Sequence, residues 1–443
     1  MNARRRNRID GDNFLRVPSV VPFLEHTSRE AQLHASDRSS NMRVCMVAYT
    51  FYERDNRVMR YAETLAKRGD QVDVLSLHLS GLHDPGIRNG VRVLHVQERT
   101  LDERNQISYL IRVSLFFLRA MIRVSINHIR KPYKLVHVHS VPDFLVFTAL
   151  LPRLMGAKVI LDIHDLLPEF YGTKFHSSKD SLIFKLMRWI ERVSCAFSDH
   201  VIVPNHIWLE RIRSRSVSAS KSSVILNYPD PSIFYRRGRS RQDDRFRIVY
   251  PGTLGIHQGL DVAIRAFAAV KGTLPHADFH IYGNGEAKGA LTKLVNDLGV
   301  ADCVLFHPFM PIWEIAQVME NADLGVVPKR NDSFGNEAFS TKTLEFMALG
   351  VPLLISDTAV DRYYFNDRIV TFARSGDAND FGAKIVQLVR DPEARHRQVE
   401  NANEFIKSNN WDVKKSEYLN LVESLTGIVV PAPRKQGQGS VIQ

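Results

Sequence analysis

Apolar residues along this chain form two kinds of pattern: short continuous runs, and longer segments with an apolar residue at every third or fourth position. The continuous runs of the first half lie at residues 43–48, 71–77, 135–139, 158–163, 200–203 and 223–226. Segment 57–68 has the helical period and ends at Gly69. Strands that are apolar on both sides are typical of parallel sheets, because helices cover both faces of such sheets. The first half therefore predicts an α/β layer built on a parallel sheet.

The same alternation restarts after residue 246. Strands are predicted at residues 247–250, 278–282, 304–306, 324–328 and 352–355, and helices at 260–270, 286–298, 312–321, 341–349 and 378–390. Residues 235–245 show no apolar period, so we interpret them as an interdomain linker. This organisation predicts two Rossmann-like domains, residues 42–235 and 246–410, which face each other across a cleft. Residues 1–41 and 427–443 are predicted to be disordered tails.

Length, charge and cysteine content add to this picture. The chain has 443 residues, which suits two domains, and its formal net charge is +11. Residues 1–41 contribute only +2, from seven arginines against five acids, so most of the excess lies in the body of the protein. The three cysteines stand far apart in apolar surroundings. They indicate neither a disulfide framework nor a metal site, and they favour a reducing compartment.

Membrane contact is predicted from one basic helix rather than from a spanning segment. The chain lacks an apolar run of about 18 residues, and its arginine-rich start lacks the apolar core of a signal peptide, so we expect a cytoplasmic protein. On a helix over residues 109–130, four arginines fall within about 40° of one another beside an apolar face. They are Arg112, Arg119, Arg123 and Arg130. Such a stripe can lie on anionic lipid at the inner face of the cell membrane, or it can be a solvated face over the core.

The most specific segment is residues 336–352, which reads Asn-Glu-Ala-Phe-Ser-Thr-Lys-Thr-Leu-Glu-Phe-Met-Ala-Leu-Gly-Val-Pro. Ser340 is a suitable N-cap for helix 341–349, and a glycine followed closely by a proline ends that helix. The free amides of the first turn, together with the positive end of the helix dipole, provide a binding site for a phosphate. Glu345 lies more than one turn further on, near enough to hold a diol of a bound nucleotide. Glu337 lies in the preceding loop, where a transferred group would be.

This segment resembles the Glu-x7-Glu motif of the large family of retaining glycosyltransferases called family 4, whose motif is roughly Glu-x-Phe-Gly-x4-Glu-Ala-Met-Ala-x-Gly-x-Pro. Ser340 stands where that family has glycine. Further segments that match the family in order lie at residues 137–139, 198–203, 227–234 and 282–285. The resemblance covers about residues 42–426. It implies a GT-B fold with an N-terminal acceptor domain, a C-terminal nucleotide-sugar domain and a final helix, 411–426, that crosses back to the N-terminal domain.

The resemblance also implies roles for particular residues. His164 and Glu337 are the candidate catalytic residues: His164 would contact the donor sugar and Glu337 would hold its hydroxyls. Glu345 would hold the ribose diol. The other candidate donor contacts are Gly252, Thr253, His257, Gly283, Lys329, Ser340, Thr341 and Lys342. The candidate acceptor contacts are Arg57, Asp165 and Glu169.

Two departures from the family bear on the donor diphosphate and the first loop. The family has Gly-Arg-Leu-x3-Lys-Gly, whose two cations hold the diphosphate, whereas residues 252–259 carry Thr253 and Gln258 at those positions. The negative charge of a desolvated phosphate must be compensated by cations or hydrogen-bond donors of the protein. We favour Lys342 for this role, because it lies in the first turn of helix 341–349; Lys329, Arg330 and His257 are the alternatives. In the first loop, Arg57 begins a helix and either contacts acceptor or diphosphate or is a solvated charge.

We expect no metal and no cofactor, because the only Asp-x-Asp is Asp10-Gly-Asp12 in the predicted tail. We also expect no nucleic acid as partner, since aromatic residues are not interspersed among the basic ones and the sequence lacks known nucleic-acid-binding motifs. The sequence thus predicts a metal-independent, retaining transferase that moves a sugar from a nucleotide-diphosphate donor to a lipid-linked or polysaccharide acceptor in surface glycan synthesis. The alternatives are a non-catalytic GT-B subunit that binds membrane or a partner, a nucleotide-sugar epimerase, and a basic polyanion-binding protein.

Overall fold

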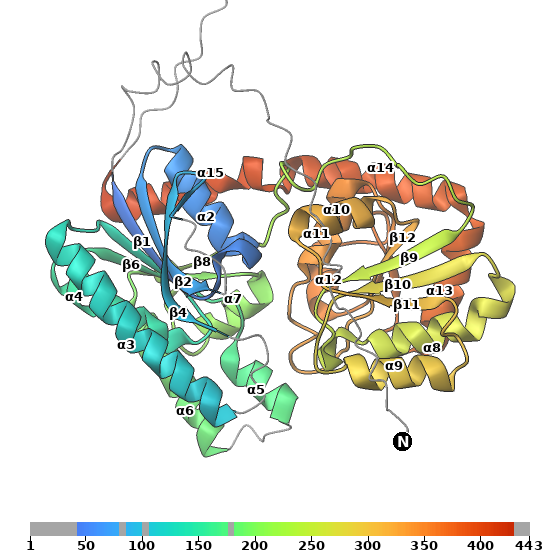
Figure 1. The fold of residues 1–443 in the computed structure, drawn as a ribbon, viewed down its shortest axis with the longest axis horizontal. Coiled ribbons are helices and arrows are strands. Elements are labelled where there is room, and N and C mark those ends of the chain that lie inside the picture. The colour runs from blue at the N-terminus through green and yellow to red at the C-terminus, as the bar shows by residue number, and fades with distance from the viewer. Residues whose placement is uncertain (1–41, 79–85, 100–105, 176–180, 429–443) are drawn as a thin grey trace, which may run out of the picture. The chain divides into compact units, whose positions relative to one another are not determined.

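The computed structural model of the protein describes residues 42–78, 86–99, 106–175 and 181–428 (Figure 1). The predicted N-terminal tail, with Asp10 and Asp12, and residues 429–443 of the predicted C-terminal tail lie outside the described residues. Two parallel sheets organise the rest of the chain.

The first sheet has the strand order β3-β4-β2-β1-β5-β6-β7-β8. Its strands are β1 (Arg43–Phe51), β2 (Gln71–His78), β3 (Ile87–Arg88), β4 (Val91–Glu98), β5 (Leu135–His139), β6 (Lys158–Asp162), β7 (His200–Val203) and β8 (Ser222–Val224). Neighbouring strands are parallel, except that β3 and β4 form an antiparallel pair.

Helices cover both faces of this sheet. They are α2 (Asn56–Lys67), α3 (Gln106–Arg130), α4 (Leu150–Leu154), α5 (Leu167–Phe175), α6 (Leu182–Phe197) and α7 (His206–Arg213). Val44 and Met46 of β1 face the apolar cluster that contains α2, and Cys45 and Val47 face the cluster that contains α3, α6 and α7. Because successive side chains of a strand point to opposite faces, a sheet covered on both sides requires the continuous apolar runs seen in the sequence.

The second sheet has the strand order β11-β10-β9-β12-β13-β14, and all its neighbouring strands are parallel. Its strands are β9 (Phe246–Pro251), β10 (Ala277–Tyr282), β11 (Val304–His307), β12 (Leu324–Val327), β13 (Leu353–Ser356) and β14 (Thr371–Ala373). Its helices are α8 (Leu260–Val270), α9 (Lys288–Asp297), α10 (Ile312–Glu320), α11 (Thr341–Leu349), α12 (Ala359–Tyr364), α13 (Ala378–Arg390) and α14 (Pro392–Ser408).

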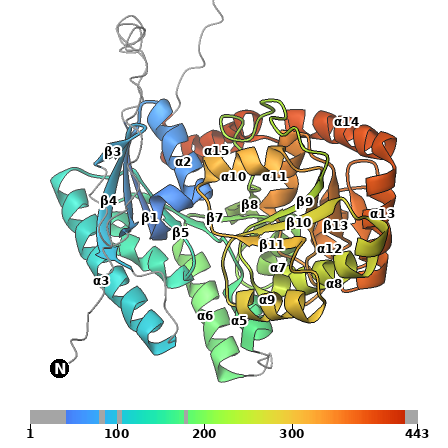
Figure 2. The same ribbon diagram turned by 45° about the vertical axis from the view of Figure 1, so that its right-hand side comes forward.

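The last helix, α15 (Trp411–Thr426), returns to the first sheet, as Figures 1 and 2 show. The indole N–H of Trp411 donates to Thr64 Oγ1 of α2 at 2.9 Å, and Tyr418 Oη lies 2.9 Å from His137 Nδ1 of β5. Both sheets and α15 belong to one compact unit of the chain. This architecture confirms the predicted α/β fold with a C-terminal helix that crosses back. Within the described residues, no helix is long and apolar enough to cross a membrane.

Candidate active site

The N-terminus of α11 is open to a ligand. Ser340 is its N-cap, as predicted, but the Ser340 side chain makes no capping hydrogen bond, and its Oγ is buried without a partner. The helix ends at Gly350, whose φ of 72° is the left-handed conformation that glycine adopts most easily. The N-cap side chain therefore leaves the first turn of α11 uncapped, and a bound phosphate could take the place of that cap.

Three cavities meet at Thr341, which lines all of them. The aromatic cavity, of about 520 Å³, is lined by Tyr282, Phe309 and Trp313, and also by Gly252, Thr253, Gly283, Lys342 and Glu345. The loop cavity, of about 430 Å³, is lined by Asp165, His257, Lys329, Ser340 and Lys342. The α2 cavity, of about 370 Å³, is lined by Arg57, His164, Asn227 and Glu345. Tertiary structure thus brings most of the predicted site residues to one place, whereas Glu169 and Glu337 line none of these three cavities.

Lys342 lies over the loop that follows β9. Its Nζ is 5.2 Å from the centroid of the Tyr250 ring, and a Cβ at Gly252 would lie only 2.5 Å from its Cε. Burial lowers the pKa of Lys342 to about 8, although Glu345 acts in the opposite direction. Burial likewise raises the pKa of Glu345 above its ordinary value. The lysine therefore occupies the loop in which Thr253 and Gln258 replace the family's two cations.

The other candidate cations are already paired. Lys329 is buried, and its Nζ lies 2.8 Å from Asp361 Oδ2 and donates to Ala338 O at 2.7 Å. Arg330 pairs with Asp261 at 2.5 Å. Among the described residues, Lys342 has neither an ion pair nor a hydrogen bond of its own, so it is the cation best placed for a diphosphate.

Asp162 is the centre of a buried network at the carboxyl end of β6. Arg57 donates to both of its oxygens, through Nε at 2.7 Å and Nη2 at 2.6 Å. His139 Nδ1 and His164 Nε2 lie 3.1 and 3.2 Å from Asp162 Oδ2. Burial alone would raise the pKa of Asp162, but Arg57 and the two histidines hold it well below its ordinary value. Burial opposes protonation of His164, yet the hydrogen bond and charge of Asp162 outweigh it and raise the pKa of His164.

The same network binds the whole guanidinium of Arg57. Its remaining donor, Nη1, bonds to Ile225 O and to Asn227 Oδ1, both at 2.8 Å. Since its side chain is only 4% exposed, the guanidinium faces its own half of the protein rather than solvent. Its predicted contact with acceptor or diphosphate stays a prediction, whereas the alternative of a solvated charge is wrong, because its partners bury the guanidinium.

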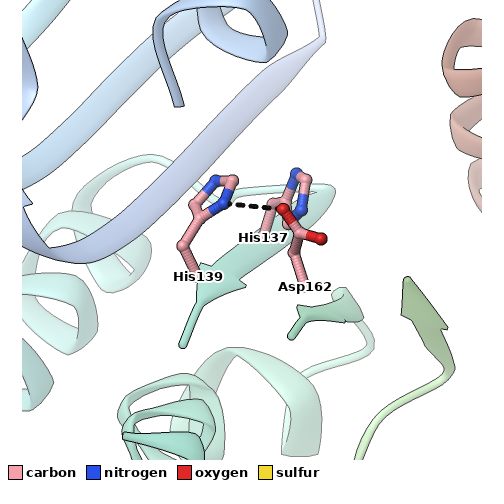
Figure 3. A group of neighbouring side chains, drawn as sticks. All are labelled: His137, His139 and Asp162. Atoms are coloured by element: carbon pink, nitrogen blue, oxygen red, sulfur yellow. Dashed lines mark hydrogen bonds and ion pairs between the residues drawn. The ribbon is translucent and has the colours of Figure 1, made fainter. Parts of the chain in front are cut away.

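His137, His139 and Asp162 form the one group within the described residues whose ligand atoms are close enough to hold a metal ion, within 4.8 Å of one another (Figure 3). The rings of His137 and His139 are stacked with centroids 4.2 Å apart, and Tyr418 bonds to His137. Both oxygens of Asp162 already accept from Arg57. A metal ion would have to compete with that guanidinium for the only anionic oxygens, so the geometry favours a hydrogen-bond network.

Two family profiles match the chain. "Glycosyl transferase 4-like domain" matches residues 55–227, and "Glycosyl transferases group 1" matches residues 232–405. The chain belongs to the group 1 glycosyltransferases. A curated relative of this group 1 glycosyltransferase is the alpha-D-kanosaminyltransferase of Streptomyces kanamyceticus, 25% identical over 272 residues, which are 57% of this chain and 67% of the relative. The chain spans about half the length of further curated relatives, 45% and 46% of two glycosyltransferases.

Solved structures of low sequence identity share the fold of this group 1 glycosyltransferase. Sucrose-phosphate synthase from Thermosynechococcus elongatus matches with a TM-score of 0.74 at 16% identity, over 88% of this chain and 100% of that chain. Anabaena Alr3699/HepE in complex with UDP-glucose matches with a TM-score of 0.66 at 14% identity, over 86% and 100%. These matches confirm the predicted GT-B fold.

In this group 1 glycosyltransferase, the two predicted glutamates outside the cavities share one arginine that the sequence did not reveal. Arg211 of α7 pairs with Glu337 Oε1, and its Nη1 lies 3.7 Å from Glu169 Oε1. Glu169 also accepts two hydrogen bonds from Arg215, at 2.6 and 3.0 Å. Glu169 is therefore surrounded by guanidinium groups, and its predicted contact with an acceptor stays a prediction. Arg211 lies 126 residues before Glu337, so no local pattern could have linked them.

Proposed function

We propose that this group 1 glycosyltransferase transfers a sugar, with retention of configuration, from a nucleotide-diphosphate donor to a glycan or lipid-linked acceptor in surface glycan synthesis. The observation that carries the proposal is the meeting of Lys342, Glu345 and the Gly252 loop at the uncapped start of α11. A phosphate bound there would accept hydrogen bonds from the first-turn amides. The positive end of the helix dipole and one ammonium group would also attract it.

The aromatic cavity suits the nucleoside of the donor. Its volume of about 520 Å³ lies in the range of small-molecule sites, and its aromatic and apolar walls carry four charged residues, Glu53, Arg54, Lys342 and Glu345. Glu345 would accept hydrogen bonds from the ribose diol, and Lys342 would contact the diphosphate. The Anabaena HepE structure in complex with UDP-glucose makes a nucleotide sugar the natural first ligand to test.

The chemistry follows from charge that develops on the leaving phosphate. As the bond between the sugar and the phosphate breaks, negative charge grows on the phosphate, and preorganised donors stabilise it best. We propose that α11 and Lys342 supply these donors without a metal ion, and that the leaving phosphate accepts the proton of the attacking hydroxyl on the same face of the sugar. His164, with its raised pKa, would donate a hydrogen bond to the donor sugar or phosphate.

The test is thermal stabilisation of the protein by UDP, GDP, ADP and their glucose or mannose derivatives, without metal. At ligand concentrations about 100-fold above Kd, we expect one nucleotide to raise Tm by roughly 3–6 °C. Glu345→Ala should abolish that shift because it removes the diol contact. Glu314→Ala, an exposed acid on α10, is the matched control and should keep it. A shift that survives in Glu345→Ala would contradict the assignment of this site.

The non-catalytic alternative is favoured by one observation, the replacement of the family's two diphosphate-binding cations by Thr253 and Gln258. Tyr250 Oη donates to Gln258 Oε1 at 3.0 Å, so the side chain of this uncharged glutamine is held by Tyr250. Release of nucleoside diphosphate from the stabilising donor distinguishes the two functions. Stabilisation without any turnover, with or without a glycan acceptor, would favour a binding subunit.

We further propose that helices α3, α4 and α6 rest on an anionic membrane, which would bring a lipid-linked acceptor to the site. We call their outer face the apolar–basic surface. Its exposed apolar residues are Leu110, Ile111, Leu115, Leu118, Ile122, Ile126 and Ile129 of α3, Leu154 and Met155 at α4, and Leu182, Ile183, Leu186 and Trp189 of α6. Its exposed cations include Arg119, Arg123, Arg130, Lys185, Arg188 and Arg192.

The charge and polarity of the apolar–basic surface match anionic lipid. Helices α3 and α4 contain no acid, and the single acid of α6, Glu191, is 1% exposed. Exposed Trp189, at 62%, is a residue type enriched where membrane meets water. An apolar stripe flanked by cations, with no exposed acid, is the pattern of helices that lie in the membrane interface.

Vesicle co-sedimentation tests this contact. We expect binding to vesicles containing phosphatidylglycerol, weakened by salt, and little binding to phosphatidylcholine alone. Arg119→Gln/Arg123→Gln should weaken binding roughly 10–30-fold, because each cation near the surface contributes about 1 kcal/mol. Arg362→Gln/Arg374→Gln removes the same charge from the other half of the protein and should bind like wild type. Equal losses in the two double variants would rule out this surface.

A further inference from the structure

Helix α7 holds the loop of Glu337 at two points. Asn205, the buried N-cap of α7, accepts from Trp208 N at 2.8 Å through its side-chain oxygen. Its side-chain nitrogen donates to Glu337 O at 3.0 Å. Two turns further along α7, Arg211 pairs with Glu337 Oε1. Backbone and side chain of Glu337 are thus both held by one helix of the opposite half.

Arg211 is itself held in place by a row of alternating charges. The row runs Glu191, Arg215, Glu169, Arg211, Glu337. Arg215 donates to Glu191 at 2.8 and 2.5 Å, while Glu191 and Glu169 are only 1% and 7% exposed. A lone surface ion pair contributes little and orders little, but a partly buried row with several hydrogen bonds holds each member in one position.

One oxygen of Glu337 is left without a partner. The Glu337 side chain is 14% exposed, Oε1 is taken by Arg211, and Oε2 is buried with no hydrogen bond within the described part of the chain. Its neighbours Gly335, Ala338 and Ser340 line the loop cavity. A buried carboxylate oxygen without a donor is costly, so it is a strong acceptor for a ligand hydroxyl.

We propose that Arg211 is a positioning residue for sugar transfer: it pairs with Oε1 of Glu337 so that Oε2 accepts a hydroxyl of the donor sugar. Neither Arg211 nor Glu337 lines the three cavities, but Gly335, Ala338 and Ser340 beside Glu337 line the loop cavity, so Arg211 would act through Glu337 and its loop. This inference rests on the proposed function, because it assigns the sugar of the nucleotide donor to the loop cavity. Without the guanidinium, the carboxylate would lose its orientation while the nucleotide contacts of Lys342 and Glu345 remained.

The test compares Arg211→Met, Arg211→Lys, Glu337→Gln and the double variant Arg211→Met/Glu337→Gln. Arg245→Met is the matched control, since Arg245 and Asp278 form an ion pair of similar exposure, 41% and 12%, against 34% and 14% for Arg211 and Glu337. The donor is the nucleotide sugar that stabilises wild type most, and UDP-glucose is the first probe. We expect Arg211→Met to lower kcat about 10–100-fold while UDP affinity stays within about twofold. Arg211→Lys should restore part of the rate, and the double variant should be no slower than Glu337→Gln.

A measurement without ligand separates this inference from the proposed function. In ligand-free protein, amide hydrogen exchange of residues 335–340 should be faster in Arg211→Met and unchanged in Arg245→Met. Unchanged exchange, or rate losses that simply multiply in the double variant, would overturn the positioning role. Faster exchange in a protein that turns over no donor would show that Arg211 holds the Glu337 loop, and would reject the proposed transferase activity together with a role of Arg211 in sugar transfer.

Discussion

Replacing Lys342 with methionine is expected to weaken binding of the stabilising nucleoside diphosphate roughly 10–100-fold, because a charge-assisted contact to phosphate is lost. The same change is expected to raise the Tm of the free protein by roughly 2–5 °C. Folding half-buries Lys342 and gives its ammonium group neither an ion pair nor a hydrogen bond among the described residues, although Glu345 attracts it at longer range. Methionine fills a similar volume without charge. Loss of binding together with a gain in stability would identify a residue kept for function.

The pH dependence of both effects follows from the pKa of Lys342, which burial lowers to about 8. Between that value and the ordinary lysine pKa, the unfolded chain binds more protons than the folded one, so wild-type stability rises with pH. The gain in Tm of Lys342→Met over wild type should therefore have its largest value below pH 8 and should become smaller as the pH rises above 8. Nucleotide affinity should fall as pH rises through 8, since the free protein loses the ammonium proton that the diphosphate requires.

Differential scanning fluorimetry and isothermal titration calorimetry between pH 6.5 and 9.5 measure both effects. Lys293→Met, an exposed lysine of α9 paired with Asp297, is the control and should change neither quantity. Gly252→Ala should act like Lys342→Met on binding, because the added methyl carbon would lie 2.5 Å from Lys342 Cε. Unchanged nucleotide affinity in Lys342→Met would show that the phosphate lies elsewhere.

Replacing Asp162 with asparagine is expected to lower the free energy of unfolding by about 3–5 kcal/mol, because it leaves the guanidinium of Arg57 buried without a counter-charge. Arg57 and Asp162 are 4% and 0% exposed, and both carboxylate oxygens accept from the guanidinium. His139 and His164 lose their shared acceptor in the same step. A loss of that size is a large part of the total stability of a typical domain.

Urea unfolding at pH 7 measures this loss. Asp367→Asn removes an acid from an exposed pair with Arg362 and should cost no more than about 0.5 kcal/mol. The contribution of Asp162 should disappear as pH falls through its depressed folded pKa, so variant and wild type should converge in strong acid. A loss in Asp162→Asn as small as that in the control would mean that the Arg57–Asp162 pair is not desolvated in solution.

Strands and helices with one clear apolar period could be predicted from the sequence almost to the residue. The prediction at 341–349 matches α11, 260–270 matches α8, and 135–139 matches β5. Elements of mixed pattern were missed. β4 (Val91–Glu98) has partly exposed positions in its centre, and α14 is largely polar with two buried residues, so neither has the continuous or periodic apolar signal on which prediction depends.

The candidate site divides in the same way. The start of α11, with Ser340 as its N-cap and with Lys342 and Glu345 on the helix, could be predicted because caps and side-chain spacing all lie within a short segment. That this helix start binds a phosphate stays a prediction. The partners of these residues could not. Asp162 binds Arg57 105 residues away, and Arg211 binds Glu337 126 residues away. Charged residues at such separations carry no pattern that distinguishes a buried pair from solvated side chains.

Local patterns thus sufficed for the α/β class, for most elements of the two sheets and for the position of helix α11 and its caps, since backbone preferences and apolar periods act over a few residues. The tertiary structure decided which charges are available to a ligand. Lys329 and Arg57 are paired inside the protein, while Lys342 lies half-buried beside the Gly252 loop without an ion pair among the described residues. Whether a charge is desolvated and what faces it depends on strands and helices that meet only when the chain folds, and that determines whether a cation is structural or free to bind phosphate.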